Sequence, residues 1–330
     1  MEPVERCIRR ANWFLRRRDL LARGYTDREL ESALADHRIF RVRHGWYSVP
    51  SAPEPAICAV RVGGRLTGIH AMQLHGLAVP RRRIVDVSVP ANACRLRDPE
   101  DRRRRLEAKH GVRIHWADSR REHHGSPWLV PLDEALLFVL CTEPRDIAVA
   151  CASAVMRRKR WSQQRLRKVF DRAPLRARRW LGLVSALDDS HGETFVRLWL
   201  LDADIPTESQ AYFPKVGHLD FRVSANVYIE IDGAQHDPSW TGEGESSYEN
   251  DHDRDAIVAA QGGTTLRHTY RQLYGNWAGC LAAIERAIAD DRELIARRMR
   301  DPIVPRAARV RRKRRRSSPN AAQKGVSPPT

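Results

Sequence analysis

The chain has 330 residues, enough for two or three domains, and 42% of them are hydrophobic, which excludes wholesale disorder. Its 58 Lys and Arg residues outnumber its 41 Asp and Glu residues, and the formal net charge of +17 favours a partner that is a polyanion. No run of about 18 apolar residues is present, so we expect no membrane partner. The N-terminus lacks the apolar core of a secretory signal, and the six cysteines form no CxxC pair, so we expect reduced thiols and a cytoplasmic location.

The charge is divided unevenly along the chain. Residues 1–50 carry a net +4 and residues 51–189 carry +12, whereas residues 190–300 carry −7 and residues 301–330 carry +8. This division suggests a nucleic-acid-binding surface joined to a module that uses carboxylates; the alternative is that the arginine-rich helices are merely solvated. The tail 301–330, with its run RRKRRR, is expected to be disordered and to add salt-sensitive contacts to phosphates.

The first fifty residues predict a winged helix-turn-helix. Thr26 and Glu29 have the spacing of a capping box, and the apolar residues that follow predict a helix over 27–36. The segment RIFRVRHGWYSV then predicts two strands with a turn at His44-Gly45. The basic side chains that we expect to contact DNA phosphates or bases are Arg28, Arg38, Arg41 and Arg43.

The segment LLARGYTDRELESALADHRIFRVRHGWYSVP resembles the N-terminal winged helix of AbiEi-type antitoxins from type IV toxin–antitoxin systems. The segments GRLTGIHAMQLHGLAVP and WLVPLDEALLFVL are similar to the middle region of such chains. The resemblance covers roughly residues 10–175 and implies DNA binding and autoregulation of an operon. The alternative for this region is a winged helix that mediates only protein contacts.

The middle region alternates expected helices with expected strands and ends near residue 187. Its histidines, including His70 and His75, lack a metal-ligand spacing and are interpreted as structural. Whether this region binds DNA or a protein partner is left open. The helices are expected over 66–76, 132–141, 145–157 and 162–170, and the strands over 84–89 and 112–116.

The acidic module contains two strands that alternate strictly between apolar and polar residues, at 216–223 and 226–232. A hairpin centred on Ala225 pairs Asp220 with Glu230, with Cβ atoms roughly 5 Å apart. Two carboxylates this close repel each other unless a cation lies between them, and oxygen ligands suit Mg²⁺ or Mn²⁺. The alternative is a pair of exposed carboxylates on a solvated strand face.

This module also resembles a second family. The pattern E-x-D-G-x-x-H followed by D-x-x-R-D, after an S-x-x-E helix and an x-D-F strand, is similar to a domain related to very-short-patch-repair (Vsr) endonucleases, within the PD-(D/E)xK restriction-endonuclease-like superfamily. The resemblance covers about residues 188–288. It implies that Asp220 and Glu230 bind the metal, that His236 acts as a base or stabilises charge, and that Asp232 replaces the usual lysine. The other polar residues that it assigns to the catalytic site are Glu193, Asp251 and Arg254, with Asp255 beside them.

We therefore expect an α+β multidomain protein. The leading hypothesis is a DNA-directed, Mg²⁺-dependent or Mn²⁺-dependent endonuclease, a hydrolase of phosphodiester bonds. The alternative is a noncatalytic DNA-binding regulator or antitoxin with a scaffold nuclease fold, and RNA cleavage is a third reading. The oligomeric state is left open. The expected domains are a winged helix over 1–50, an antitoxin-like mixed α/β middle domain over 51–187, a restriction-endonuclease-like α/β domain over 188–300 and the basic tail over 301–330.

Overall fold

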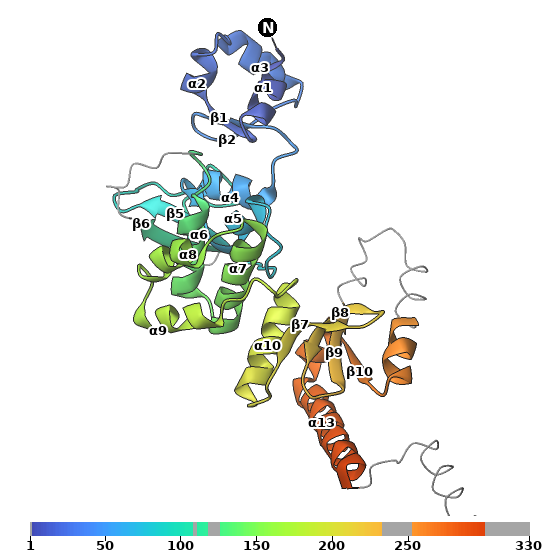
Figure 1. Cartoon of the computed structure of the whole chain (residues 1–330). Helices are drawn as coiled ribbons and strands as arrows, with labels where there is room; N and C mark the ends of the chain where they lie inside the picture. Colours follow the sequence, from blue (N-terminus) through green and yellow to red (C-terminus); the bar gives the residue numbers. More distant parts are fainter. Residues whose placement is uncertain (1, 108–110, 118–125, 233–252, 301–330) are drawn as a thin grey trace, which may run out of the picture. The chain divides into compact units, whose positions relative to one another are not determined.

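Contacts between residues divide the chain into two compact units, Met1–Ala211 and Tyr212–Thr330. The structure is a computed structural model that describes residues 2–107, 111–117, 126–232 and 253–300 (Figure 1). It is an α+β protein, as expected, and has three small sheets in its described part. No helix within these ranges is both long and apolar enough to cross a membrane. The predicted tail 301–330 lies outside the described residues.

The N-terminal part of the first unit combines three short helices with a three-stranded antiparallel sheet of order β1-β3-β2. The predicted helix over 27–36 is confirmed, because the Thr26 side chain and the Glu29 side chain cap it reciprocally. The predicted hairpin is also confirmed, with its turn at His44-Gly45. The elements are α1 Val4–Arg10, β1 Phe14–Arg16, α2 Arg17–Leu21, α3 Asp27–Ala35, β2 Phe40–Arg43 and β3 Trp46–Ser48.

The middle part of the first unit is a mixed sheet of order β4-β5-β6 with helices around it. The expected helices and strands are confirmed to within a few residues. Leu66 is an exception, because it lies in β4 and pairs with Val87 instead of starting a helix. The elements are α4 Glu54–Val62, β4 Arg65–Leu66, α5 Gly68–Leu74, β5 Val85–Pro90, β6 Val112–Ala117, α6 Leu132–Thr142, α7 Arg145–Arg158, α8 Gln163–Phe170, α9 Leu175–Arg178 and the 3₁₀ helix η1 Arg179–Leu183.

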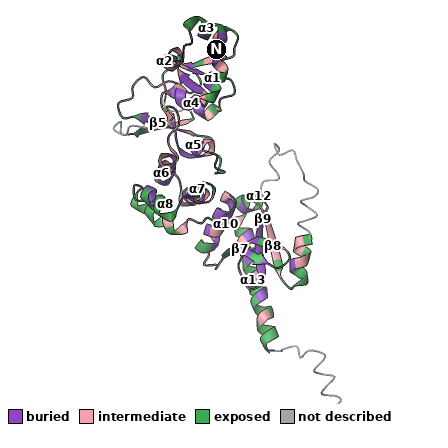
Figure 2. Cartoon of the chain, turned by 45° about the horizontal axis from the view of Figure 1, so that its top comes forward, coloured by how far each residue is buried: buried purple, intermediate pink, exposed green. Residues whose placement is uncertain are grey.

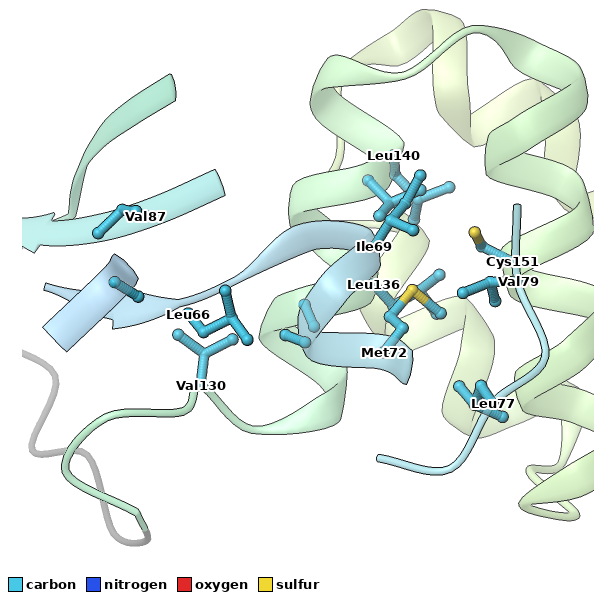
Figure 3. Close-up of a cluster of buried hydrophobic side chains, with 14 of the residues drawn as sticks. Leu66, Ile69, Met72, Leu77, Val79, Val87, Val130, Leu136, Leu140 and Cys151 are labelled. Atoms are coloured by element: carbon cyan, nitrogen blue, oxygen red, sulfur yellow. The ribbon is translucent and has the colours of Figure 1, made fainter. Parts of the chain in front are cut away.

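The core of this part lies between the sheet and helices α5, α6 and α7. Leu66, Ile69 and Met72 are fully buried there, beside Leu136 and Leu140 of α6 (Figure 3). Burying apolar side chains of this size contributes about 1.5–3 kcal/mol each. The buried residues continue through the helices of this part, whereas α8 keeps an exposed outer face (Figure 2).

The first unit ends with α10 (His191–Asp202) and the start of β7 (Glu208–Phe213). Ser190 caps α10, because its side chain accepts a hydrogen bond from the Glu193 amide. Helix α10 packs on α7, and Arg145 of α7 forms a two-pronged ion pair with Asp202 at 2.8 and 2.5 Å.

The second unit is built on the sheet of order β10-β9-β8-β7. Strands β8 and β9 are antiparallel, whereas β9 and β10 are parallel, so a crossover that includes a helix over 253–260 connects them. Strand β9 is central and is buried on both faces along most of its length. The remaining elements are β8 Gly217–Arg222, β9 Val227–Asp232, β10 Thr264–Thr269, α12 Tyr270–Gly275 and α13 Trp277–Arg300.

Candidate functional site

Asp220 and Glu230 lie on neighbouring strands in the predicted register. Phe221 pairs with Ile229 and Arg222 pairs with Tyr228, which centres the hairpin on Ala225 as predicted. Asp220 directly precedes the paired Phe221, and Glu230 directly follows the paired Ile229. Asp220 Oδ2 also accepts a hydrogen bond from the Ile231 amide at 2.7 Å, which ties its carboxylate to β9. The Asp220 carboxylate therefore lies against β9, next to Glu230 in the sequence of that strand.

The environment of these carboxylates is only partly open to water. Glu230 is buried, with 7% of its surface exposed, whereas Asp220 and Asp232 are half-buried. Glu230 is covered because β9 lies between β8 and β10, so its neighbours flank it on both sides. A buried carboxylate needs a cation or hydrogen-bond donors close to it.

Arg254, on the helix over 253–260, supplies such a donor. Its Nη2 donates a hydrogen bond to Glu230 Oε1 at 3.1 Å and another to the His218 carbonyl oxygen at 2.8 Å. The Arg254 side chain is only about one third exposed. The predicted site residues Glu230 and Arg254 therefore contact each other as an ion pair.

Arg267 of β10 was not predicted from the sequence as a site residue. Its guanidinium donates to Asp255 at 2.7 and 3.2 Å and to Asp232 at 3.2 Å. It reaches them because the parallel register aligns Arg267 with Glu230 and Thr269 with Asp232. Asp232 and Asp255, both singled out in the sequence, are thus joined through one arginine.

His268 follows on the same strand and is also buried. Burial lowers the pKa of its imidazole, and the nearby Asp232 carboxylate only partly opposes that effect. We therefore expect a neutral imidazole near pH 7. The histidine aligns with Ile231 in the ladder, so its side chain belongs to the opposite face of the sheet from Glu230.

Glu193 lies on α10 in the first unit, where its carboxylate caps the helix. Glu193 Oε2 accepts hydrogen bonds from the Asp189 amide at 2.7 Å and from Gln210 Nε2 at 3.2 Å. These contacts join Glu193 to the residue before the N-cap of α10 and to β7. His236 and Asp251, the two other predicted catalytic residues, lie outside the described residues.

Asp220 and Glu230 offer oxygen donors of the kind that Mg²⁺ prefers. Mg²⁺ is often bound by one or two carboxylates, with waters and substrate phosphates completing its shell, so a pair of carboxylates fits this ion. Within the described ranges, no group of three or more His, Cys, Asp or Glu side chains is arranged to hold a metal. The described residues therefore offer a metal ion no cluster of three or more such side chains.

The four arginines predicted to contact DNA differ in their surroundings. Arg28 and Arg41 are exposed. Arg38 forms ion pairs with Glu5 at 2.6 Å and with Asp36 at 3.0 Å, so part of its charge is compensated. Arg43 is half-buried and lines a pocket behind the hairpin.

In comparisons with known proteins, the chain matches neither a protein-family model nor a curated protein sequence.

Proposed function

We propose that the protein binds DNA and that its second unit is a metal-dependent endonuclease that hydrolyses phosphodiester bonds. The observation that carries this proposal is the hydrogen bond from the Ile231 amide to Asp220 Oδ2, which brings the Asp220 carboxylate next to Glu230 on the sheet. A pair of carboxylates held in this way is typical of a site for a divalent cation. The proposal extends the resemblance of this segment to the very-short-patch-repair endonucleases.

Asp220 and Glu230 would hold Mg²⁺ or Mn²⁺. When bound, such a cation polarises a phosphate oxygen and lowers the pKa of a coordinated water. The Ile231 amide holds Asp220 in one orientation, so its second oxygen keeps a fixed direction. Arg254 is positioned beside Glu230, where its charge would also attract a phosphate group. His236 remains the predicted proton acceptor.

The N-terminal part of the first unit would bring the DNA to the protein. Its chain order α1-β1-α2-α3-β2-β3 supports the assignment as a winged helix, in which the helix after the turn enters the major groove and the hairpin forms the wing. Helix α3 is fixed to α2 by the two-pronged ion pair between Arg17 and Asp27 at 2.9 and 2.5 Å. Arg28 on α3 and Arg41 on the hairpin are exposed for contacts with phosphates.

The proposal is tested by incubating the full chain with supercoiled plasmid and Mg²⁺ or Mn²⁺. We expect nicking that disappears with EDTA and in the Glu230→Gln variant, which keeps an acceptor for Arg254 and loses the negative charge. Asp204→Asn is the matched control because Asp204 lies outside both strands. Nicking that survives in Glu230→Gln would contradict the assignment of Glu230.

A second candidate is a noncatalytic DNA-binding regulator of the antitoxin type, and one observation favours it. The carboxylates already have cationic partners: Glu230 pairs with Arg254, and Asp232 pairs with Arg267. Such pairs would stabilise a scaffold without a metal. DNA binding in a gel shift, together with no cleavage of any plasmid, mismatched or modified DNA, would support this candidate over the nuclease.

A further inference from the structure

Arginines gather around a small pocket in the first unit, where the β2–β3 hairpin meets the end of α4. The pocket has a volume of about 200 Å³, enough for several water molecules. Arg16, Arg43 and Arg65 line it together with Trp46, and none of its described lining residues is acidic. The charge of Glu134 opposes the effect of burial on the pKa of Arg65 only in part. Three positive charges around one cavity are costly unless further anions compensate them.

Arg43 of β2 lies against Gly63, the residue that ends α4. A Cβ atom added to Gly63 would overlap the end of the Arg43 side chain, so the guanidinium lies directly over this glycine. Gly63 also has a φ of +112°, a conformation that side chains disfavour. Burial, together with the charge of Arg97, lowers the pKa of Arg43, and none of the described residues gives its side chain a hydrogen bond or an ion pair.

Arg65 is anchored at one nitrogen and unsatisfied at the others. Its Nη2 donates to the carbonyl oxygens of Ser126 at 3.0 Å and Leu129 at 2.7 Å. Its Nε and Nη1 are buried and have no hydrogen-bond acceptor within the described part of the chain. A buried donor without an acceptor costs about 1–3 kcal/mol, and more when it is charged. The structure thus fixes this guanidinium while leaving two of its nitrogens without an acceptor.

Arg16 completes the set from β1. Its guanidinium carbon lies 4.9 Å from the centre of the Trp46 ring, an orientation that a cation–π contact stabilises. The partial negative charge at the C-terminus of α4 amounts to about half an elementary charge, so it compensates only a fraction of the three arginines. The amides of Gly63 and Gly64 donate to the Ala59 carbonyl and are not free to bind a ligand. The donors are therefore the side chains of Arg16 and Arg43, whereas Arg65, whose Nε and Nη1 are buried, contributes its charge.

We propose that the pocket formed by Arg16, Arg43 and Arg65 binds a phosphate group. Guanidinium groups bind phosphate oxygens through paired, charge-assisted hydrogen bonds, and convergent arginines give both affinity and orientation. The phosphate comes either from a DNA backbone that passes the hairpin or from a free phosphate or small phosphate ester. That the phosphate belongs to DNA rests on the proposed function. That the pocket binds phosphate does not rest on it.

The position of the pocket favours a DNA backbone. It lies behind the same hairpin that carries the exposed Arg41, and Arg102 of a second basic segment donates to the Arg41 carbonyl oxygen at 3.3 Å. Basic side chains from two parts of the sequence therefore lie close together at this hairpin. A phosphate bound in the pocket would fix the register of the hairpin on the duplex without reading its sequence.

The first test measures thermal unfolding of the full chain in inorganic phosphate and in chloride at equal ionic strength. We expect phosphate to raise the Tm of the wild type by a few degrees. We expect Arg43→Gln and Arg16→Gln to lose most of this shift. Arg10→Gln serves as the matched control because Arg10 is 77% exposed and lies outside the pocket. A phosphate shift that is absent from the wild type, or equal in all variants, overturns the proposal.

The second test separates the two sources of phosphate through the salt dependence of DNA binding, followed by fluorescence anisotropy. If the pocket holds a backbone phosphate, Arg43→Gln reduces the slope of log K against log salt by about one, and Arg10→Gln does not. An unchanged slope overturns the DNA source. A phosphate-dependent Tm shift in a protein that binds no DNA would overturn the proposed function and leave a site for a small phosphate ester.

Discussion

Arg254 Nη2 lies 3.1 Å from Glu230 Oε1, and the same nitrogen donates to the carbonyl oxygen of His218 at 2.8 Å. This one side chain therefore connects the crossover helix to both β8 and β9. The contact has two consequences. It stabilises a buried carboxylate, and it places a positive charge where a metal ion or a phosphate would otherwise be the partner of Glu230.

Removing the guanidinium of Arg254 is expected to destabilise the second unit. Arg254→Met should lower the free energy of unfolding by about 1–3 kcal/mol, because buried Glu230 loses a charged donor. Urea unfolding measures the change, and Arg271→Met, at an exposed position on α12, should remain within about 0.5 kcal/mol of the wild type. If Arg254→Met is as stable as Arg271→Met, the ion pair contributes nothing to the fold.

The turn between β8 and β9 depends on Asp291 of α13. This buried carboxylate accepts hydrogen bonds from Ser224 Oγ at 2.7 Å and from the side chain and backbone of Asn226 at 2.9 and 3.2 Å. We expect Asp291→Ala to cost about 2–4 kcal/mol, because several donors lose their acceptor together. The neighbouring Asp290→Ala is the control in the same unfolding experiment, since Asp290 is exposed. Equal stability of the two variants would exclude a role of Asp291 in holding the turn.

The first unit should lose stability in acid through Asp86. Burial alone would raise the pKa of Asp86, but hydrogen bonds from His115 and Arg113 outweigh burial and lower the pKa below its ordinary value. The stabilisation is therefore present above the unfolded pKa of about 3.9 and is lost as the pH falls through the lower folded pKa. Below about pH 4, we expect the unfolding free energy to fall more steeply for the wild type than for Asp86→Asn. Parallel curves would contradict this assignment.

The two arginines at positions 38 and 41 should differ in their effect on DNA binding. Arg41→Gln is expected to weaken binding to all sequences alike and to reduce the salt slope by about one. Arg38→Gln should have a smaller effect, because Glu5 and Asp36 already share the charge of Arg38. Fluorescence anisotropy across a range of salt concentrations compares the two variants. A larger loss in Arg38→Gln would show that its ion pairs open when DNA binds.

The sequence predicts the structure correctly where the interacting residues are close along the chain. The three residues Ser224-Ala225-Asn226 fixed the β8–β9 register, because a short turn allows few alignments. The capping box of Thr26 and Glu29 likewise marked the start of α3. Both signals act within a few residues.

The sequence does not predict the contacts between segments that are far apart along the chain. Arg267 reaches Asp232 through a parallel pairing that follows a long crossover, and the alternation of β10 alone does not specify that register. Arg38 contacts Glu5 across 33 positions, and Arg43 is covered by the end of α4 at Gly63. The sequence pattern of these segments does not show which of the arginines tertiary contacts neutralise or bury.

The central claim is that Asp220 and Glu230 together bind a divalent cation. The most direct measurement is the binding of Mn²⁺ to the full chain, followed by electron paramagnetic resonance, because it needs no knowledge of the DNA substrate. Wild-type protein is expected to bind one Mn²⁺ that Mg²⁺ displaces. Asp220→Asn, which keeps an acceptor for the Ile231 amide, should weaken the binding of Mn²⁺ by at least about 10-fold. No Mn²⁺ binding by the wild type, or equal binding by Asp220→Asn, would contradict the claim and favour the noncatalytic regulator.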